Sequence, residues 1–154
     1  MALTASIPFP ENPEHRAEAT RRVEAATGLN RDVLEALVRA FYDRARRDAL
    51  IGMKFDGVHN WEDHIARITT FWSSVALQTG EYHGQPLPRH VPLGLQGEHF
   101  RRWLALFEET AREVCSPAGA ALVIEKARRI AQSMEIGMAV ARGELPPLRR
   151  PPQR

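Results

Sequence analysis

Apolar residues recur every three or four positions along most of this 154-residue chain. This period is typical of amphipathic helices, which turn one apolar face toward a core. It predicts five helices, over residues 14–26, 31–47, 61–78, 98–114 and 117–142. Alternation of apolar and polar residues, which indicates a half-buried strand, does not occur, and neither do internal repeats. The chain is therefore expected to form an all-α domain over residues 14–143.

Residues that favour the ends of helices support these boundaries. Asn30 and Asn60 each precede a predicted helix, and asparagine is a preferred N-cap. Ser116 and Pro117 combine a capping serine with a proline at the first helical position. Gly143 follows the last predicted helix and is expected to end it. Capping and periodicity thus predict the same helices.

The predicted helix over residues 61–78 contains a histidine that its amphipathic pattern does not require. Each helical residue advances about 100° around the axis, which gives an apolar stripe roughly 120° wide. The stripe consists of Trp61, Ile65, Ile68, Phe71, Trp72 and Val75. His64 projects into this stripe between Trp61 and Phe71. A single histidine on an apolar face is more often a hydrogen-bonded core residue than a ligand, so the position is compatible with both.

The helical pattern is interrupted over residues 80–97, where four Gly and three Pro accompany His83 and His90. Loops longer than about 12–15 residues inside a compact domain are usually functional. Tyr42 lies at the edge of the stripe of the second predicted helix, and Trp103 within that of the fourth. If the stripes converge, Tyr42, His64, His90 and Trp103 line one cavity. Tyrosine and tryptophan at such positions are also common core residues.

Composition and charge narrow the class of protein. A content of 44% hydrophobic and 26% charged residues is ordinary for a globular protein. The net charge of +2 comes from residues 144–154, which contain three Arg and one Glu, so residues 1–143 are neutral overall. Nucleic-acid binding usually needs a basic surface, which this distribution of charge does not indicate.

No secretory signal and no run of about 18 apolar residues occurs in the sequence. The single Cys115 excludes an intramolecular disulfide and fits a reducing compartment. We expect a cytoplasmic protein with flexible ends over residues 1–13 and 144–154, and with no membrane or nucleic-acid partner.

The common hydrolytic and metal motifs are absent. No Gly-flanked serine and no phosphate-binding Gly loop occurs. His59 and His64 do not form a His-Glu-x-x-His pair, and His83, His90 and His99 lack the spacing of a structural zinc site. The chemistry expected of the chain therefore depends on polar groups placed among aromatic residues.

Four segments of the chain resemble the group III truncated haemoglobins of bacteria. They are FYDRARRD (41–48), WEDHIARITTFW (61–72), YHGQPLPRH (82–90) and HFRRWLALFEET (99–110). They occur in the order and spacing of that family, and Tyr-x-Gly-x-Pro-x-x-x-His is the most specific of them. The resemblance implies a globin-like fold, the truncated two-over-two helical sandwich, around one haem b.

The resemblance also implies a role for individual residues. His90 matches the proximal ligand of the haem iron. Tyr42, His64 and Trp103 match the distal residues, and Trp103 matches a tryptophan that hydrogen-bonds or shields the bound ligand. The Tyr42 hydroxyl and the Trp103 N–H can donate hydrogen bonds to a bound gas, and His64 could contact it or gate its entry. The residues that match the aromatic haem pocket are Phe41, Phe55, Phe71 and Trp72. Met53 departs from the proline usual in the family, which could alter the turn that leads to Phe55.

The expected function is reversible binding of O₂ and other diatomic ligands (NO, CO) by a monomeric haem protein, with oxygen transport among its uses. One alternative is an enzyme, either a nitric oxide dioxygenase or a peroxidase-like catalyst, which would need an unidentified reductase because the chain carries no reductase domain. The other is a haem-free helical interaction or sensing module. His83, Cys115 and the C-terminal tail have no assigned role.

Overall fold

Five α-helices make up most of the chain in the computed structural model, which describes residues 13–82, 84, 90 and 93–144. They are α1 (Pro13–Thr27), α2 (Arg31–Ala45), α3 (Trp61–Leu77), α5 (Gly97–Val114) and α6 (Pro117–Ala141), with a short 3₁₀ helix, η1 (Gly52–Phe55), between α2 and α3. The described residues contain no strand. The predicted helices are confirmed to within two residues at each end, and the expectations for residues 1–12, His83 and residues 145–154 lie outside the described part.

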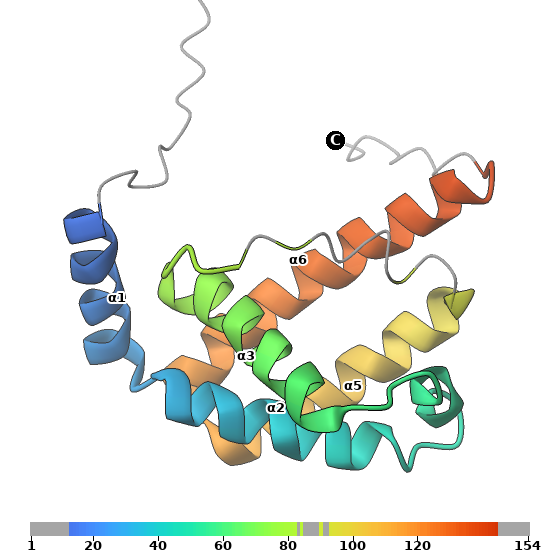
Figure 1. Ribbon diagram of the computed structural model, residues 1–154, viewed down its shortest axis with the longest axis horizontal. Coiled ribbons are helices and arrows are strands. Elements are labelled where there is room, and N and C mark those ends of the chain that lie inside the picture. Colours follow the sequence, from blue (N-terminus) through green and yellow to red (C-terminus); the bar gives the residue numbers. More distant parts are fainter. Residues whose placement is uncertain (1–12, 83, 85–89, 91–92, 145–154) are drawn as a thin grey trace, which may run out of the picture.

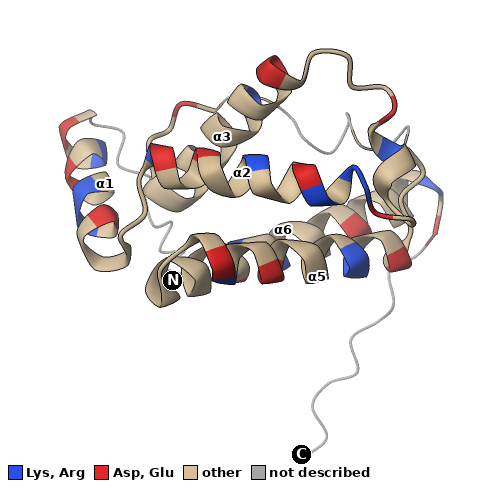
Figure 2. Cartoon of the chain, turned by 90° about the horizontal axis from the view of Figure 1, so that it is seen from below, with Lys and Arg blue, Asp and Glu red and all other residues tan. Residues whose placement is uncertain are grey.

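Helices α2, α3, α5 and α6 form two layers. Helix α2 packs against α3 and α5, and α5 runs alongside α6. The view in Figure 2 shows α2 and α3 above α5 and α6. Helix α1, which buries no residue fully, lies at one end of the molecule and contacts α3 and α6 (Figure 1). This is a two-over-two arrangement of helices with one helix added at its side.

The predicted caps are present. The Asn30 side chain accepts a hydrogen bond from the Val33 N–H at 2.9 Å, and that of Asn60 accepts one from the Asp63 N–H at 3.2 Å. Ser116 Oγ accepts from the Gly119 N–H at 3.0 Å and donates to the carbonyl of Thr27 at 2.5 Å. The cap of α6 therefore also connects the start of that helix to the end of α1.

Aromatic rings join the two layers. Phe107 of α5 is stacked between Trp72 of α3, with ring centroids 4.9 Å apart, and Trp103 of α5, at 5.3 Å. Phe107 is 1% exposed, at the centre of the core. Because aromatic pairs have preferred geometries, the stacking of Trp103 on Phe107 favours one orientation of the indole.

A buried carboxylate fixes the turn after α2. Asp48 accepts hydrogen bonds from the N–H groups of Leu50 and Ile51, at 3.0 and 3.1 Å, and from Nε of Arg102 on α5, at 2.7 Å. Only 6% of its side chain is exposed. Burial raises the pKa of this carboxyl, but the bonds from Arg102 and the two amides outweigh burial and hold the pKa below its usual value. The charged form of Asp48 thus holds the turn that precedes η1 against α5.

Replacing Asp48 with Asn is expected to lower the free energy of unfolding at pH 7 by about 1–3 kcal/mol, since hydrogen bonds to a charged group are lost. A carboxyl whose folded pKa is depressed stabilises the fold above its unfolded pKa, and this contribution is lost as pH falls through the folded value. The difference in the free energy of unfolding between wild type and variant should therefore decrease as the pH is lowered. Urea unfolding at pH 7, 5 and 3 measures it, with Asp56→Asn, an exposed site, as the control. A gap that stays constant with pH would contradict this account.

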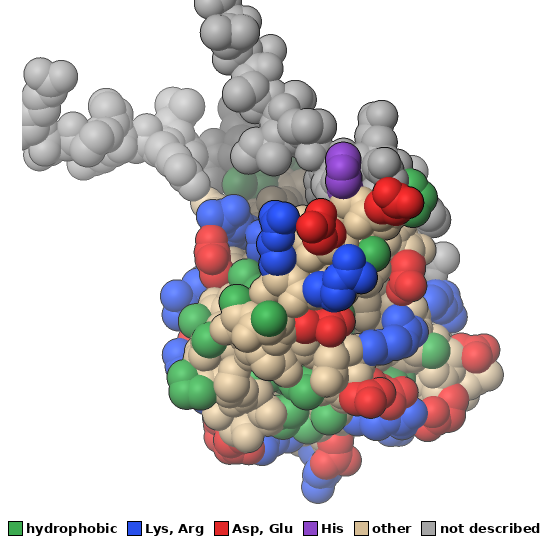
Figure 3. All heavy atoms as spheres, turned by 90° about the vertical axis from the view of Figure 1, so that its left-hand side faces the viewer, with side chains coloured by type: hydrophobic (Ala, Val, Ile, Leu, Met, Phe, Trp, Pro, Cys, Tyr) green, Lys and Arg blue, Asp and Glu red, His purple; other side chains and the backbone are tan. Residues whose placement is uncertain are grey.

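The surface carries both signs of charge. On the face shown in Figure 3, Lys and Arg side chains are interspersed with Asp and Glu, and apolar side chains are scattered among them. Within the described residues, no helix has the length and apolar character needed to span a membrane.

Candidate functional site

A cavity of about 840 Å³ lies between the layers, within the size range of pockets that hold a cofactor. Helices α2, α3, α5 and α6, η1 and the segment between α3 and α5 contribute side chains to it, and its lining is mainly apolar. Seven of the eight residues proposed from the sequence line it, namely Tyr42, Phe55, His64, Phe71, Trp72, His90 and Trp103. The convergence of stripes expected from the sequence is therefore present.

Phe41 is the eighth residue, and it lies behind the cavity wall. Its side chain is 3% exposed and contacts Tyr42 and Trp103 edge-on, with ring centroids 5.2 and 5.7 Å apart. It is not among the described residues that line the cavity. Phe41 therefore supports two lining residues from the core side.

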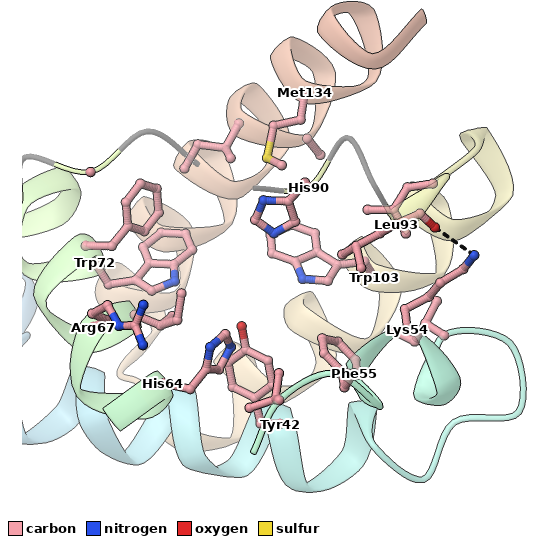
Figure 4. Close-up of a pocket in the computed structure, with 18 of the residues that line it drawn as sticks. Tyr42, Lys54, Phe55, His64, Arg67, Trp72, His90, Leu93, Trp103 and Met134 are labelled. Carbon is pink, nitrogen blue, oxygen red and sulfur yellow. Dashed lines mark hydrogen bonds between the residues drawn. The ribbon is translucent and has the colours of Figure 1, made fainter. Parts of the chain in front are cut away.

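Tyr42 and His64 form one wall of the cavity. Tyr42 lies in the last turn of α2 and His64 in the first turn of α3, and their rings meet edge to face with centroids 5.0 Å apart. The Tyr42 hydroxyl points into the cavity (Figure 4). Withdrawal from water raises the pKa of this hydroxyl well above its usual value. It is therefore protonated at neutral pH and available as a hydrogen-bond donor.

His64 carries a buried nitrogen with no partner. Its Nε2 atom makes no hydrogen bond within the described chain. Burial, followed by the nearby charges of Arg67 and His90, lowers the pKa of the imidazole below its usual value, so it is neutral at pH 7. Buried polar atoms nearly always have a partner, and leaving one without costs stability. The unpartnered nitrogen indicates that the cavity receives a ligand with a polar atom.

His90 lies on the opposite side of the cavity from Tyr42 and His64 (Figure 4). It belongs to the segment between α3 and α5, and Met134 of α6 lies on the same side. A neutral imidazole is a common axial ligand of haem iron. The arrangement separates one potential iron ligand from a set of polar side chains across the cavity.

Two cationic residues in the cavity wall were missed by the sequence analysis. Lys54 Nζ donates to the carbonyl of Leu93 at 2.9 Å and so connects η1 to the segment that follows His90. Arg67 lies three residues after His64 on α3, and its guanidinium is directed toward the cavity (Figure 4). The three-residue spacing from His64 was a usable signal for Arg67, whereas nothing local indicates the contact of Lys54.

Met53, which stands where a proline was expected from the resemblance, does not disrupt the cavity wall. The Met53 side chain is 67% exposed, while Phe55, two residues later, lines the cavity and contacts Tyr42 with centroids 5.4 Å apart. Methionine in place of the family's proline therefore does not remove Phe55 from the site.

Comparison with known proteins identifies the family. The chain is 31% identical over 113 residues to the group 3 truncated hemoglobin ctb of Campylobacter jejuni subsp. jejuni serotype O:2, an alignment that covers 70% of this chain and 89% of that protein. The chain belongs to the group III truncated haemoglobins. A crystal structure of the group III truncated hemoglobin from Campylobacter jejuni matches with a TM-score of 0.65 and 32% identity, over 70% of this chain and 89% of that one. No family model matches the chain.

Membership of the truncated haemoglobins confirms the two-over-two globin fold and implies a haem cofactor. The cavity fits such a group. Its walls are mainly apolar, an imidazole stands on one side, and an unpartnered imidazole nitrogen and a phenol hydroxyl stand on the other. A flat apolar macrocycle with a central metal suits this distribution of side chains. The chain is thus a ligand-binding haem globin.

Proposed function

We propose that this globin binds a diatomic gas, O₂ in the first place, reversibly at haem b. His90 is the proximal ligand, and Tyr42, His64 and Trp103 are the distal residues that contact the gas. The proposal is carried by one observation: the Tyr42 hydroxyl and the His64 imidazole, whose Nε2 has no partner in the described chain, line the cavity on the side opposite His90. Haem held by His90 would supply an iron atom that binds diatomic gases.

The distal side chains favour a ligand that gains partial negative charge when it binds. The Tyr42 hydroxyl stays protonated, and the Trp103 indole N–H is always a donor. Donors held in place within an apolar cavity act more strongly than donors in water. They would stabilise O₂, which gains partial negative charge when it binds a ferrous haem, more than CO, which stays nearly neutral. Selectivity for O₂ then depends on the positions of these two donors.

Absorption spectra test the proposal. The purified chain, titrated with haem, is expected to bind one equivalent and to show an intense Soret band. The band should shift on reduction and again when CO is added. A purified chain that shows no Soret band and takes up no added haem would contradict the proposed function.

Arg67 is the residue best placed to pair with the carboxylates of haem, because it lines the cavity while its side chain reaches solvent. Exposed ion pairs are weak, so Arg67→Ser is expected to speed haem release by roughly 2- to 5-fold. Transfer of haem to an excess of apomyoglobin measures the rate. Arg22→Ser, an exposed site on α1, is the control, and equal rates for the two variants would count against the role of Arg67.

A further inference from the structure

Trp61 stands outside the cavity and contacts three residues that line it. Its ring lies 5.6 Å from that of Tyr42, 5.5 Å from that of His64 and 6.2 Å from that of Phe55, measured between centroids. Trp61 is the first residue of α3 and is not among the described residues that line the cavity. One indole therefore backs side chains that come from α2, η1 and α3.

His64 depends on this contact more than a hydrogen-bonded histidine would. Its Nε2 has no partner to fix the orientation of the ring. The imidazole instead packs edge to face against both Tyr42 and Trp61. Because an aromatic edge-to-face contact has a preferred geometry, removal of either neighbouring ring frees the imidazole to rotate.

A cation lies over the ring of Trp61. The guanidinium of Arg46 lies 4.0 Å from the centroid of the Trp61 ring. Arg46 caps the C-terminal end of α2 and is exposed, and tryptophan is the best acceptor for such cation–π contacts. The Trp61 ring thus contacts both a guanidinium on the surface and three of the rings that line the cavity.

We propose that Trp61 is a positioning residue that holds Tyr42 and His64 in the orientation in which they face the ligand, and that Arg46 holds Trp61 in place. The inference rests on the proposed function. It assigns to a residue outside the cavity the task of fixing the two side chains that contact the gas.

Five variants test the role of Trp61. Trp61→Leu removes the ring, and Trp61→Phe retains an aromatic wall. Arg46→Met removes both the charge and the planar contact, whereas Arg46→Lys keeps the charge alone. Leu122→Ala is the control, because Leu122 packs against the core from α6 and does not line the cavity. Thermal unfolding of all five variants establishes that each is folded and by how much it is destabilised.

Two measurements separate positioning from stability. The first is the infrared stretching band of CO added to the reduced, haem-loaded protein, which reports the donors near the gas. Trp61→Leu should broaden this band and move it toward that of a Tyr42→Phe reference, and O₂ release should quicken by roughly 3- to 30-fold. Trp61→Phe should restore most of the wild-type band. The Arg46 variants should shift it in the same direction as Trp61→Leu but less, Arg46→Lys least.

The second measurement does not need haem. Deuterium exchange at the imidazole carbon between the two nitrogens of His64, followed by mass spectrometry on the full chain, reports how exposed the ring is. Exchange should quicken in Trp61→Leu and stay at the wild-type rate in Leu122→Ala. A wild-type band and exchange rate in folded Trp61→Leu, or equal changes in Leu122→Ala, would overturn the proposal. If the wild-type chain takes up no haem, the proposed function fails, and the exchange rates alone decide whether Trp61 positions His64.

Discussion

His90→Gly is expected to lose the axial bond to haem iron and, with it, the ferrous spectrum of the wild type. His90 lies across the cavity from Tyr42 and His64. Its replacement by glycine therefore removes the imidazole proposed to bind the iron. Haem release should quicken by at least about tenfold, which corresponds to 1.4 kcal/mol. Absorption spectra of the reduced variant and haem transfer to apomyoglobin measure the two effects.

A matched control and a rescue sharpen this test. His99 also lines the cavity, but its Nδ1 already accepts a hydrogen bond from the Gln96 N–H at 2.8 Å. His99→Ala should therefore keep the wild-type spectrum. Free imidazole, which fits the space left by the side chain, should restore the spectrum of His90→Gly. A wild-type ferrous spectrum in His90→Gly without added imidazole would show that another residue holds the iron.

Tyr42→Phe is expected to quicken O₂ release by roughly 5- to 150-fold, because a hydrogen bond inside a protected cavity contributes about 1–3 kcal/mol. The variant removes only the hydroxyl and keeps the ring that contacts Phe55 and His64. CO release should change far less, since CO gains little from a donor. Stopped-flow displacement of each gas measures the two rates.

Tyr82→Phe is the matched control for this prediction. Tyr82 also lines the cavity, where its ring meets that of Phe71 with centroids 5.1 Å apart. Its hydroxyl has no proposed role, so O₂ release should stay near the wild-type rate. If both tyrosine variants accelerate O₂ release equally, the effect belongs to the polarity of the cavity and not to a donor at Tyr42.

The helices were predictable because the information for them is local. Periodic apolar residues, together with the caps at Asn30, Asn60 and Ser116, define each element within a few turns of chain. The meeting of Tyr42, His64 and Trp103 followed from the same stripes, since short connections bring apolar faces together. Their chemical roles and that of His90 came from the resemblance to the family and remain predictions.

Three features of the structure were not predicted from the sequence, each for a different physical reason. The four residues of η1 are too few to show a helical period, so the sequence pattern does not indicate this element. The hydrogen bond between Arg102 and Asp48 joins positions 54 residues apart. Phe41 and Tyr42 are neighbours in α2, and neighbours on a helix point about 100° apart. One of them therefore faces the cavity while the other enters the core.

The three tryptophans of the chain stand around one cavity. Trp72 and Trp103 line it, and Trp61 backs three of its lining residues. Haem absorbs where tryptophan emits, and transfer of excitation energy over such short distances is efficient. All the tryptophan fluorescence of this protein thus originates beside the cavity, and its intensity serves as an intrinsic gauge of how many molecules carry haem.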